Sequence, residues 1–330
     1  MQSPSVRRRE RAQSRPPGGL PFASEDVPDL QFWQDYTSIR AFEGPAADVL
    51  LNTAVQYCTL ALRGSVNWRH TLQKDHNIDC YTLHHTAIPL LTRPAGNAAS
   101  LGMHMFMTAS SLKYAPSTLT LMRMLTGYKR SEFAKHRPKF RDAEMHFRSL
   151  LQTDKSPDVL TLQGFLLLCE NREAQALKYF DLALQTSNSN LSEEEIRRKI
   201  VRRKPRWTYE ASCHLKRGAI LSNLGRKEEA AASFRIAAYE LDVPEAFVQL
   251  ARLLPKNAPE TEICLAKAAQ AGDHEACEIL ALHAINKAAD SRLSRADRGF
   301  NAKMAREWAL LVPDPAKRED LESLLAGVQV

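Results

Sequence analysis

One set of intervals occurs twice in this chain and constrains its fold more than any other feature. In the segment GAILSNLGRKEEAAASFRIAA, alanine, phenylalanine and alanine follow the first glycine by 12, 16 and 19 residues. The segment GFLLLCENREAQALKYFDLAL has the same residue types at the same intervals. The two sets are Gly164, Ala176, Phe180 and Ala183, and Gly218, Ala230, Phe234 and Ala237. The last three positions of each set are spaced i, i+4, i+7 and therefore share one face of a helix.

These intervals predict helical hairpins. We expect each glycine to lie on a first helix, where a second helix crosses too closely for a Cβ. The alanines let the two helices approach, and each phenylalanine fills the gap to the next unit. Gly225 lies in the turn between the helices, where tight turns favour glycine. A weaker copy precedes them, because Ala143 and Phe147 lie 33 residues before Ala176 and Phe180.

The intervals resemble the tetratricopeptide repeat, a helix–turn–helix unit of about 34 residues. Gly164 and Gly218 are 54 residues apart, so we expect an insert of about 20 residues, at 186–208, within this pattern. Further on, the string KAAQAGDHEA resembles a Sel1-like repeat, a near relative of the tetratricopeptide unit. The resemblance spans about residues 140–312 and implies an all-α solenoid of stacked hairpins.

The rest of the chain also has helical patterning. Val and Ile are sparse, and no stretch alternates between apolar and polar residues as a half-buried strand does. Apolar spacing predicts a helix over residues 47–63 that stops at Gly64. We expect a second helix over 98–116, ended by Pro116, and a third over 117–128 with Ser117 as its N-cap.

Four regions follow from these patterns. Residues 1–25 form a disordered basic N-terminus, and 26–139 a helical region with degenerate repeats. Residues 140–312 form the repeat region with the insert, and 313–330 a C-terminal tail or capping helix. No apolar run approaches the roughly 18–20 residues that a transmembrane helix needs.

The composition of the N-terminal segment bears on the cellular compartment of the protein. Between residues 7 and 15 it holds five arginines against the single acid Glu10, and mitochondrial presequences are rich in Arg and Ser and poor in acids. Such a helix also needs an apolar face, and only Ala12 is apolar between Val6 and Leu20. Mitochondrial location is therefore one hypothesis, and a solvated tail on a cytoplasmic protein is the alternative. The six cysteines show no CxxC, which favours reduced thiols.

The resemblance implies a function in binding another protein. Stacked hairpins form an extended concave groove, and the family's groove positions fall here on Thr161, Phe165, Leu168, Leu215, Ala219 and Ser222. One subclass uses a Lys and an Asn four residues apart to hold the acidic C-terminal tails of chaperones. The equivalent pairs are Thr161/Phe165 and Leu215/Ala219, so we predict no carboxylate clamp of that kind. The predicted function is a non-enzymatic scaffold or assembly factor.

The insert supports an alternative function. Its basic residues are Arg197, Arg198, Lys199, Arg202, Arg203, Lys204 and Arg206, seven cations within twelve residues. With Trp207 available to stack on a base or a headgroup, this patch could contact RNA, an acidic protein or an anionic membrane. The simpler interpretation is a solvated helix whose positive charge is partly neutralised by the three glutamates before it.

Other candidate sites are weaker. A helix would align His76, Cys80 and His84 on one face, with His85 adjacent, but paired zinc-ligand motifs are missing, so we predict no metal site. The methionine-rich segment GMHMFM is typical of core packing. Dinucleotide, P-loop, zincin and esterase motifs are not found, so the chain is predicted to have no catalytic residues and no cofactor.

Overall fold

The computed structural model describes residues 20–39, 43–65, 67–92, 97–187, 202–255 and 258–328. Every regular element in these ranges is a helix, so the predicted all-α class is confirmed. The chain divides into two compact units, Met1–Lys155 and Ser156–Val330. This division lies about one short helix beyond the boundary at residue 140 that the repeat pattern indicates.

Unit 1 is built around the helices α3, α5, α6 and α7. Its elements are η1 (Ser24–Asp26), α2 (Leu30–Thr37), α3 (Ala47–Arg63), α4 (Trp68–Lys74), α5 (Cys80–Thr92), α6 (Ala98–Ser111), α7 (Ala115–Thr126), α8 (Arg130–His136), η2 (Arg137–Phe140) and α9 (Arg141–Thr153). Helix α5 packs against α3 and α6, and α6 packs against α7 and α9. The buried side chains of Trp33, Tyr57 and Phe106 fill the space between these helices.

The fold of unit 1 begins earlier than the sequence pattern predicts. Residues 1–19 lie outside the described residues, but Phe22 is only 1% exposed, and its ring centroid lies 5.2 Å from that of His104. The prediction of disorder through residue 25 is therefore wrong for residues 20–25. One buried aromatic ring anchors this stretch although its neighbours are polar.

Of the helix boundaries predicted in unit 1, the one at Gly64 is confirmed and those at Pro116 and Ser117 are wrong. Gly64 ends α3 in the left-handed conformation with φ of 65°, as expected. Helix α6 ends at Ser111, however, and Pro116 lies in the first turn of α7, where its missing N–H costs nothing. Ser117 is therefore not an N-cap. It lies buried inside α7, and its hydroxyl is 2.9 Å from His84 Nδ1.

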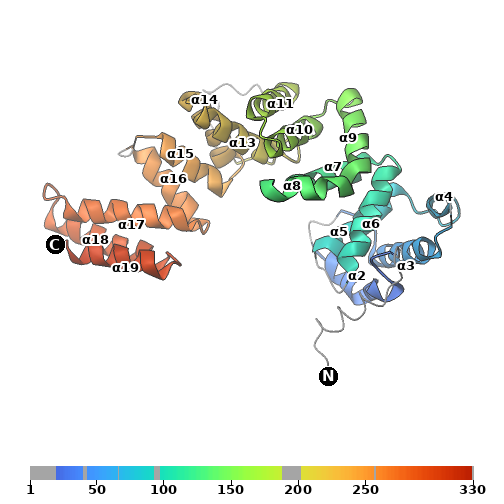
Figure 1. Cartoon of the computed structure of the whole chain (residues 1–330). Coiled ribbons are helices and arrows are strands. Elements are labelled where there is room, and N and C mark those ends of the chain that lie inside the picture. The colour runs from blue at the N-terminus through green and yellow to red at the C-terminus, as the bar shows by residue number, and fades with distance from the viewer. Residues whose placement is uncertain are drawn as a thin grey trace. The chain divides into compact units, whose positions relative to one another are not determined.

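Unit 2 consists of helices that pack mainly against their neighbours in the chain. They are α10 (Pro157–Cys169), α11 (Glu173–Thr186), α13 (Glu210–Asn223), α14 (Lys227–Arg235), η3 (Ile236–Glu240), α15 (Pro244–Leu253), α16 (Pro259–Gln270), α17 (His274–Ala289), α18 (Arg295–Leu310) and α19 (Pro315–Ala326). Helix α10 packs on α11, α13 on α14, α15 on α16 and α17 on α18 (Figure 1). Of the two alternatives for the C-terminal segment, the structure has a helix, α19.

The glycine–phenylalanine interval has the geometric basis that we expected for the glycine. A Cβ built on Gly164 would lie 2.8 Å from Cδ1 of Phe180, and one on Gly218 would lie 2.7 Å from Cε1 of Phe234. Both rings are at most 1% exposed and have no space to move away. Each phenylalanine thus contacts the glycine of its own hairpin, whereas the sequence reasoning assigned it to the gap between units.

The second helix of the Gly218 hairpin changes its pitch near its end. Helix α14 runs to Arg235 and continues as a π-helical turn, η3, in which the N–H of Leu241 donates to the carbonyl of Ile236 over 3.1 Å. This turn, which contains Ile236 and Glu240, packs against α13. Single π-helical turns are frequently found at functional sites.

Candidate functional site

Residues 202–207, which precede α13, are held against unit 2 by a tryptophan. Trp207 is 8% exposed, and its Nε1 donates to Thr161 Oγ1 on α10 over 3.3 Å. Just after it, the backbone N–H of Tyr209 donates to Asp158 Oδ1, also over 3.3 Å. The expectation that Trp207 stacks on a base or a headgroup is therefore wrong, because its indole is buried in the protein.

Arg203 connects this segment to two helices. Its Nη1 and Nη2 donate to the two carboxylate oxygens of Glu210 on α13 over 2.9 and 2.7 Å. Its Nε donates to Glu240 Oε2 on η3 over 2.6 Å, and its backbone N–H donates to the carbonyl of Glu240 over 2.9 Å. The hydrogen bonds that Arg203 donates to Glu210 are the main reason that the pKa of Arg203 is raised.

Arg203, Glu210 and Glu240 form a triad, and Glu210 shows how this triad offsets the cost of burying a charge. Its side chain is 0% exposed, and burial alone would raise the pKa of its carboxyl. Hydrogen bonds from Arg203 and from the backbone N–H of Arg206 outweigh that effect and hold the pKa below its ordinary value. Glu210 is therefore a buried carboxylate that stays charged because the Arg203 guanidinium and the Arg206 backbone N–H donate to it.

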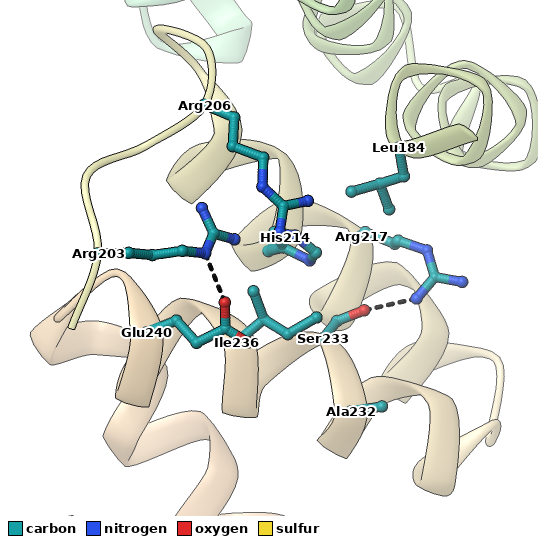
Figure 2. Close-up of a pocket in the computed structure, with 9 residues that line it drawn as sticks. All are labelled: Leu184, Arg203, Arg206, His214, Arg217, Ala232, Ser233, Ile236 and Glu240. Carbon is teal, nitrogen blue, oxygen red and sulfur yellow. Dashed lines mark hydrogen bonds and ion pairs between the residues drawn. The ribbon is translucent and has the colours of Figure 1, made fainter. Parts of the chain in front are cut away.

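A cavity of about 190 Å³ lies beside this triad. It lies among residues 202–207, the end of α11, helices α13 and α14, and the π-helical turn η3. It is lined by Leu184, Arg203, Arg206, His214, Arg217, Ala232, Ser233, Ile236 and Glu240. Figure 2 shows the Arg206 side chain extending toward His214, with Arg217 on the other side of the imidazole ring.

Two buried polar atoms on the cavity wall have no hydrogen-bond partner in the structure. They are Nδ1 of His214 and Oε1 of Glu240, from side chains that are 3% and 4% exposed as whole residues. Burial lowers the pKa of His214 to about 3, so the imidazole is neutral at physiological pH. A neutral ring offers one donor and one acceptor nitrogen.

The three arginines of the wall differ in their partners. Arg203 is paired with two glutamates, as described above. Arg217 donates from Nε to Asp181 Oδ1 over 2.7 Å and from Nη1 to Ser233 Oγ over 2.5 Å. Within the described part of the chain, the guanidinium of Arg206 has no partner, so it is the one arginine of this wall free to bind an external group.

The groove residues inferred from the family resemblance are only partly accessible. Thr161, Phe165 and Leu215 are buried, so these three offer no free surface to a partner. Thr161 accepts the hydrogen bond from Trp207, and the Phe165 ring lies 6.3 Å from that of Tyr209, edge to face. Leu168 and Ser222 are half-buried, and Ala219 is exposed. Trp207, near the end of the insert, thus covers one of these positions, Thr161.

The structure describes four of the seven residues of the predicted basic patch, and one of these four, Arg203, is engaged inside the protein. Arg197, Arg198 and Lys199 lie outside the described residues. Among the others, Arg203 belongs to the internal triad, and Arg202 forms an exposed ion pair of 3.0 Å with Asp242. Lys204 and Arg206 are exposed.

In the histidine–cysteine segment of unit 1, His84 is buried, Cys80 and His85 are half-buried, and His76 is exposed. His76 precedes α5, so it does not share a helix with Cys80, His84 and His85. Burial lowers the pKa of His84 to about 4, and its ring contacts Phe106 and Tyr114 edge to face. No group of three or more metal-ligating side chains occurs among the described residues.

A second, more apolar cavity lies at the α18–α19 hairpin. Its volume is about 400 Å³, and its wall consists of Arg306, Ala309, Leu310, Leu321, Glu322, Leu325 and Ala326. Four large apolar side chains of this hairpin and its loop are 53% to 63% exposed, namely Phe300, Leu310, Leu311 and Leu324. We call these four residues the terminal apolar surface.

Sequence reasoning missed most of the cavity beside α13. His214 and Arg217 are one turn apart on α13, and that spacing was the one local signal available. Ser233 and Glu240 join them only through the fold of the hairpin and its π-helical turn.

No helix in the described ranges has the length and apolar character that crossing a bilayer requires. No protein-family model matches the chain, and no curated protein matches it either.

Proposed function

We propose that this chain is a non-enzymatic scaffold of tetratricopeptide and Sel1-like hairpins that binds a segment of another protein. The observation that carries the proposal is the terminal apolar surface on α18 and α19. Monomeric proteins rarely leave large apolar side chains clustered in the open, and such clusters mark interaction sites. The contact surface is thus at the α18–α19 hairpin rather than at the mostly buried positions of α10 and α13.

Two features support a protein partner. Leu310, Leu311 and Leu324 are each more than half exposed on this hairpin, so burial against a partner would remove apolar surface from water. The adjoining cavity of about 400 Å³ offers room for apolar side chains of a partner. Arg306 and Glu322 in its wall supply one charge of each sign, which suits a partner helix with an apolar face and charged flanks.

The alternative function in RNA or membrane binding has less support. It relied on Trp207 and on a continuous run of free cations. Trp207 is buried, and Arg203 is engaged with Glu210 and Glu240. These residues instead attach the insert to the hairpins.

The experiment compares three tagged chains in cells by cross-linking and mass spectrometry. One is the wild type, one carries Leu310→Ser and Leu324→Ser, and the control carries Leu224→Ser, which is 56% exposed on another hairpin. We expect a protein that is enriched with the wild type and the control but lost with the double variant. With that partner purified, its affinity should fall by about tenfold or more in the double variant.

The opposite result would be equal enrichment of every protein with all three chains. In that case the terminal apolar surface would bind no partner, and the proposal would be wrong. A chain lacking residues 1–19 tests the mitochondrial hypothesis in the same cells, because this deletion leaves the buried Phe22 in place. Loss of organelle neighbours in that chain alone would support a presequence.

A further inference from the structure

The charge of this chain is unevenly distributed, and one stretch of unit 1 is strongly basic. Between residues 123 and 148, eight lysines and arginines stand against three acids, Glu132, Asp142 and Glu144. Eight cations less three anions give this stretch a formal net charge of +5, whereas the whole chain of 330 residues carries +7. The structure describes every residue of the stretch, which begins near the end of α7 and runs through α8 and η2 into α9.

Six of these cations are exposed where the four elements meet. Helix α7 packs against α8, η2 and α9 (Figure 1), so the cations of these elements lie close together. They are Arg123, Lys129, Arg130, Lys135, Lys139 and Arg141, and we call these six residues the basic surface. A residue of an α-helix rises 1.5 Å and one of a 3₁₀-helix about 2 Å, so α8 and η2 together span only about 20 Å.

Little negative charge offsets the basic surface. Helices α6 and α7, which both pack against α9, contain no Asp or Glu. The buried Glu144 accepts hydrogen bonds of 2.9 and 2.7 Å from Arg137 and one of 2.7 Å from Arg148, so these two arginines already use its charge. Only Glu132 and Asp142 remain as exposed acids in the stretch. Within the described ranges, four members of the basic surface form no ion pair, namely Lys129, Lys135, Lys139 and Arg141.

This excess of exposed cations suits a partner that carries many negative charges. An anionic membrane is one such partner, but segments that bind membranes place large apolar side chains beside their cations. No large apolar side chain is exposed between residues 123 and 141, because Phe133 and Phe140 are both buried. Met145 on α9 is a single exposed one beyond that range. The surface therefore favours a polyanion in solution over a lipid surface.

Two aromatic rings next to these cations narrow the choice. Tyr128 and His136 are half-buried and adjoin Lys129 and Lys135 in the sequence. Their ring centroids are 4.0 Å apart and their planes differ by 11°, so the rings are stacked. Proteins that bind single-stranded nucleic acids combine cations for the phosphates with aromatic side chains on which bases stack. An acidic peptide would pair with the cations alone, so the stacked rings favour a nucleic acid.

We infer that the basic surface of unit 1 binds single-stranded nucleic acid. The phosphates contact the exposed lysines and arginines, and an unpaired base adds to the stack of Tyr128 and His136. This surface shares no residue with the insert at 186–208 or with the terminal apolar surface of unit 2. The inference is therefore independent of the proposed function, and either can fail without the other.

The experiment is fluorescence anisotropy of the full chain with labelled oligouridylate and oligothymidylate of about 12 nucleotides. We expect binding whose affinity falls steeply with salt. Four to six phosphate contacts correspond to a slope of about −3 to −4 in a plot of log K against log salt concentration. Binding of either strand supports the inference, and the tighter one identifies the sugar. An absence of binding to both strands at micromolar protein and about 50 mM salt would overturn it.

Other polyanions test whether the bases contribute. An abasic strand of the same length keeps the phosphates and should bind about fivefold more weakly or worse, because base stacking on the rings is lost. Polyglutamate and vesicles that contain phosphatidylserine serve as the acidic-protein and membrane probes, and both should bind more weakly than oligouridylate. Equal affinity for the abasic strand, or tighter binding of polyglutamate or vesicles, would show that the surface does not select a nucleic acid.

A pair of double variants tests the location of the site. Lys135→Gln with Lys139→Gln should lower the affinity for oligouridylate roughly tenfold and make the salt slope less steep by about 1 to 1.5. The control, Lys178→Gln with Lys303→Gln, removes the same charge from exposed residues of unit 2 and should leave both quantities unchanged. None of these four lysines forms an ion pair among the described residues, so both chains should fold. Equal losses in the two chains, or a loss in neither, would contradict the assignment to the basic surface.

Discussion

At Gly164 and Gly218 a single missing carbon atom sets how closely two helices approach. The aromatic rings of Phe180 and Phe234 occupy the space where a Cβ would be. Since interiors are packed to crystal-like density, the ring cannot be moved without disturbing its neighbours. The recurrence of this glycine with a phenylalanine 16 residues later therefore reports one specific contact, repeated in two hairpins.

Gly164→Ala should destabilise unit 2. Overpacking costs about 1–3 kcal/mol, and the better helix propensity of alanine returns about 0.5–1 kcal/mol, so we expect a net loss of roughly 1–2 kcal/mol in the free energy of unfolding. Urea unfolding followed by circular dichroism measures it. Gly327→Ala is the control, because a Cβ there meets its nearest atom at 3.5 Å.

The partner residue allows a stricter test of the same contact. In a Phe180→Leu background, the additional cost of Gly164→Ala should shrink, because the leucine leaves space where the aromatic ring was. An undiminished cost in that background would show that the ring of Phe180 is not what excludes the Cβ.

On the scale of elements, residues 202–207 act as a strap across two helices. The strap is fixed by one buried aromatic side chain, Trp207, and one arginine, Arg203, whose three donor nitrogens reach α13 and η3. Breaking a buried ion pair by removing one partner leaves an uncompensated charge. Here the removal of Arg203 would leave two buried carboxylates, Glu210 and Glu240.

Arg203→Met should therefore destabilise unit 2 by about 3–5 kcal/mol. The adjacent Arg202→Met removes only an exposed ion pair with Asp242 and should cost about 0–1 kcal/mol. The difference between neighbouring arginines can be measured by thermal and urea unfolding of the two variants. Similar losses in both would mean that the triad contributes no more than a surface pair.

Much of this element-scale structure was predictable, and the site was not. Hairpins are local, so the intervals of Gly218, Ala230 and Phe234 were sufficient to place two helices and the turn at Gly225, whose φ is 75°. The cavity needs Arg203 from the insert and Glu240 from η3, which are 37 residues apart. Periodicity carries no information about such a pairing. It also gave no sign that Trp207 would cover Thr161.

On the scale of the whole molecule, each of the two units contains a buried histidine whose pKa is lowered. The pKa of His84 in unit 1 is lowered to about 4 and that of His214 in unit 2 to about 3, in both cases mainly by burial. The ordinary value is about 6.5. Between these values the unfolded chain binds protons that the folded chain does not, so stability rises with pH. As the pH falls below about 6.5, both units should lose stability.

We therefore expect the free energy of unfolding of both units to be lower at pH 5.0 than at pH 7.5. Each histidine contributes at most about 1.4 kcal/mol per pH unit. Hydrogen exchange of peptides from α5 and α13 at the two pH values reports on each unit separately. His84→Asn should reduce the pH dependence of exchange in α5 of unit 1 and leave that of α13 in unit 2 unchanged. A pH-independent exchange rate, after correction for intrinsic chemistry, would contradict this expectation.

The π-helical turn η3 has a consequence for how repeats in this chain are counted. A π turn contains one residue more than the α turn that it replaces, and one residue corresponds to about 100° of rotation about the helix axis. Every position after Glu240 is therefore out of phase with a count that starts at Gly218. A template of fixed length would fall one residue out of register here, although the helices continue through α16 and α17. The π-helical turn thus adds a residue to this hairpin just before the loop that leads to α15.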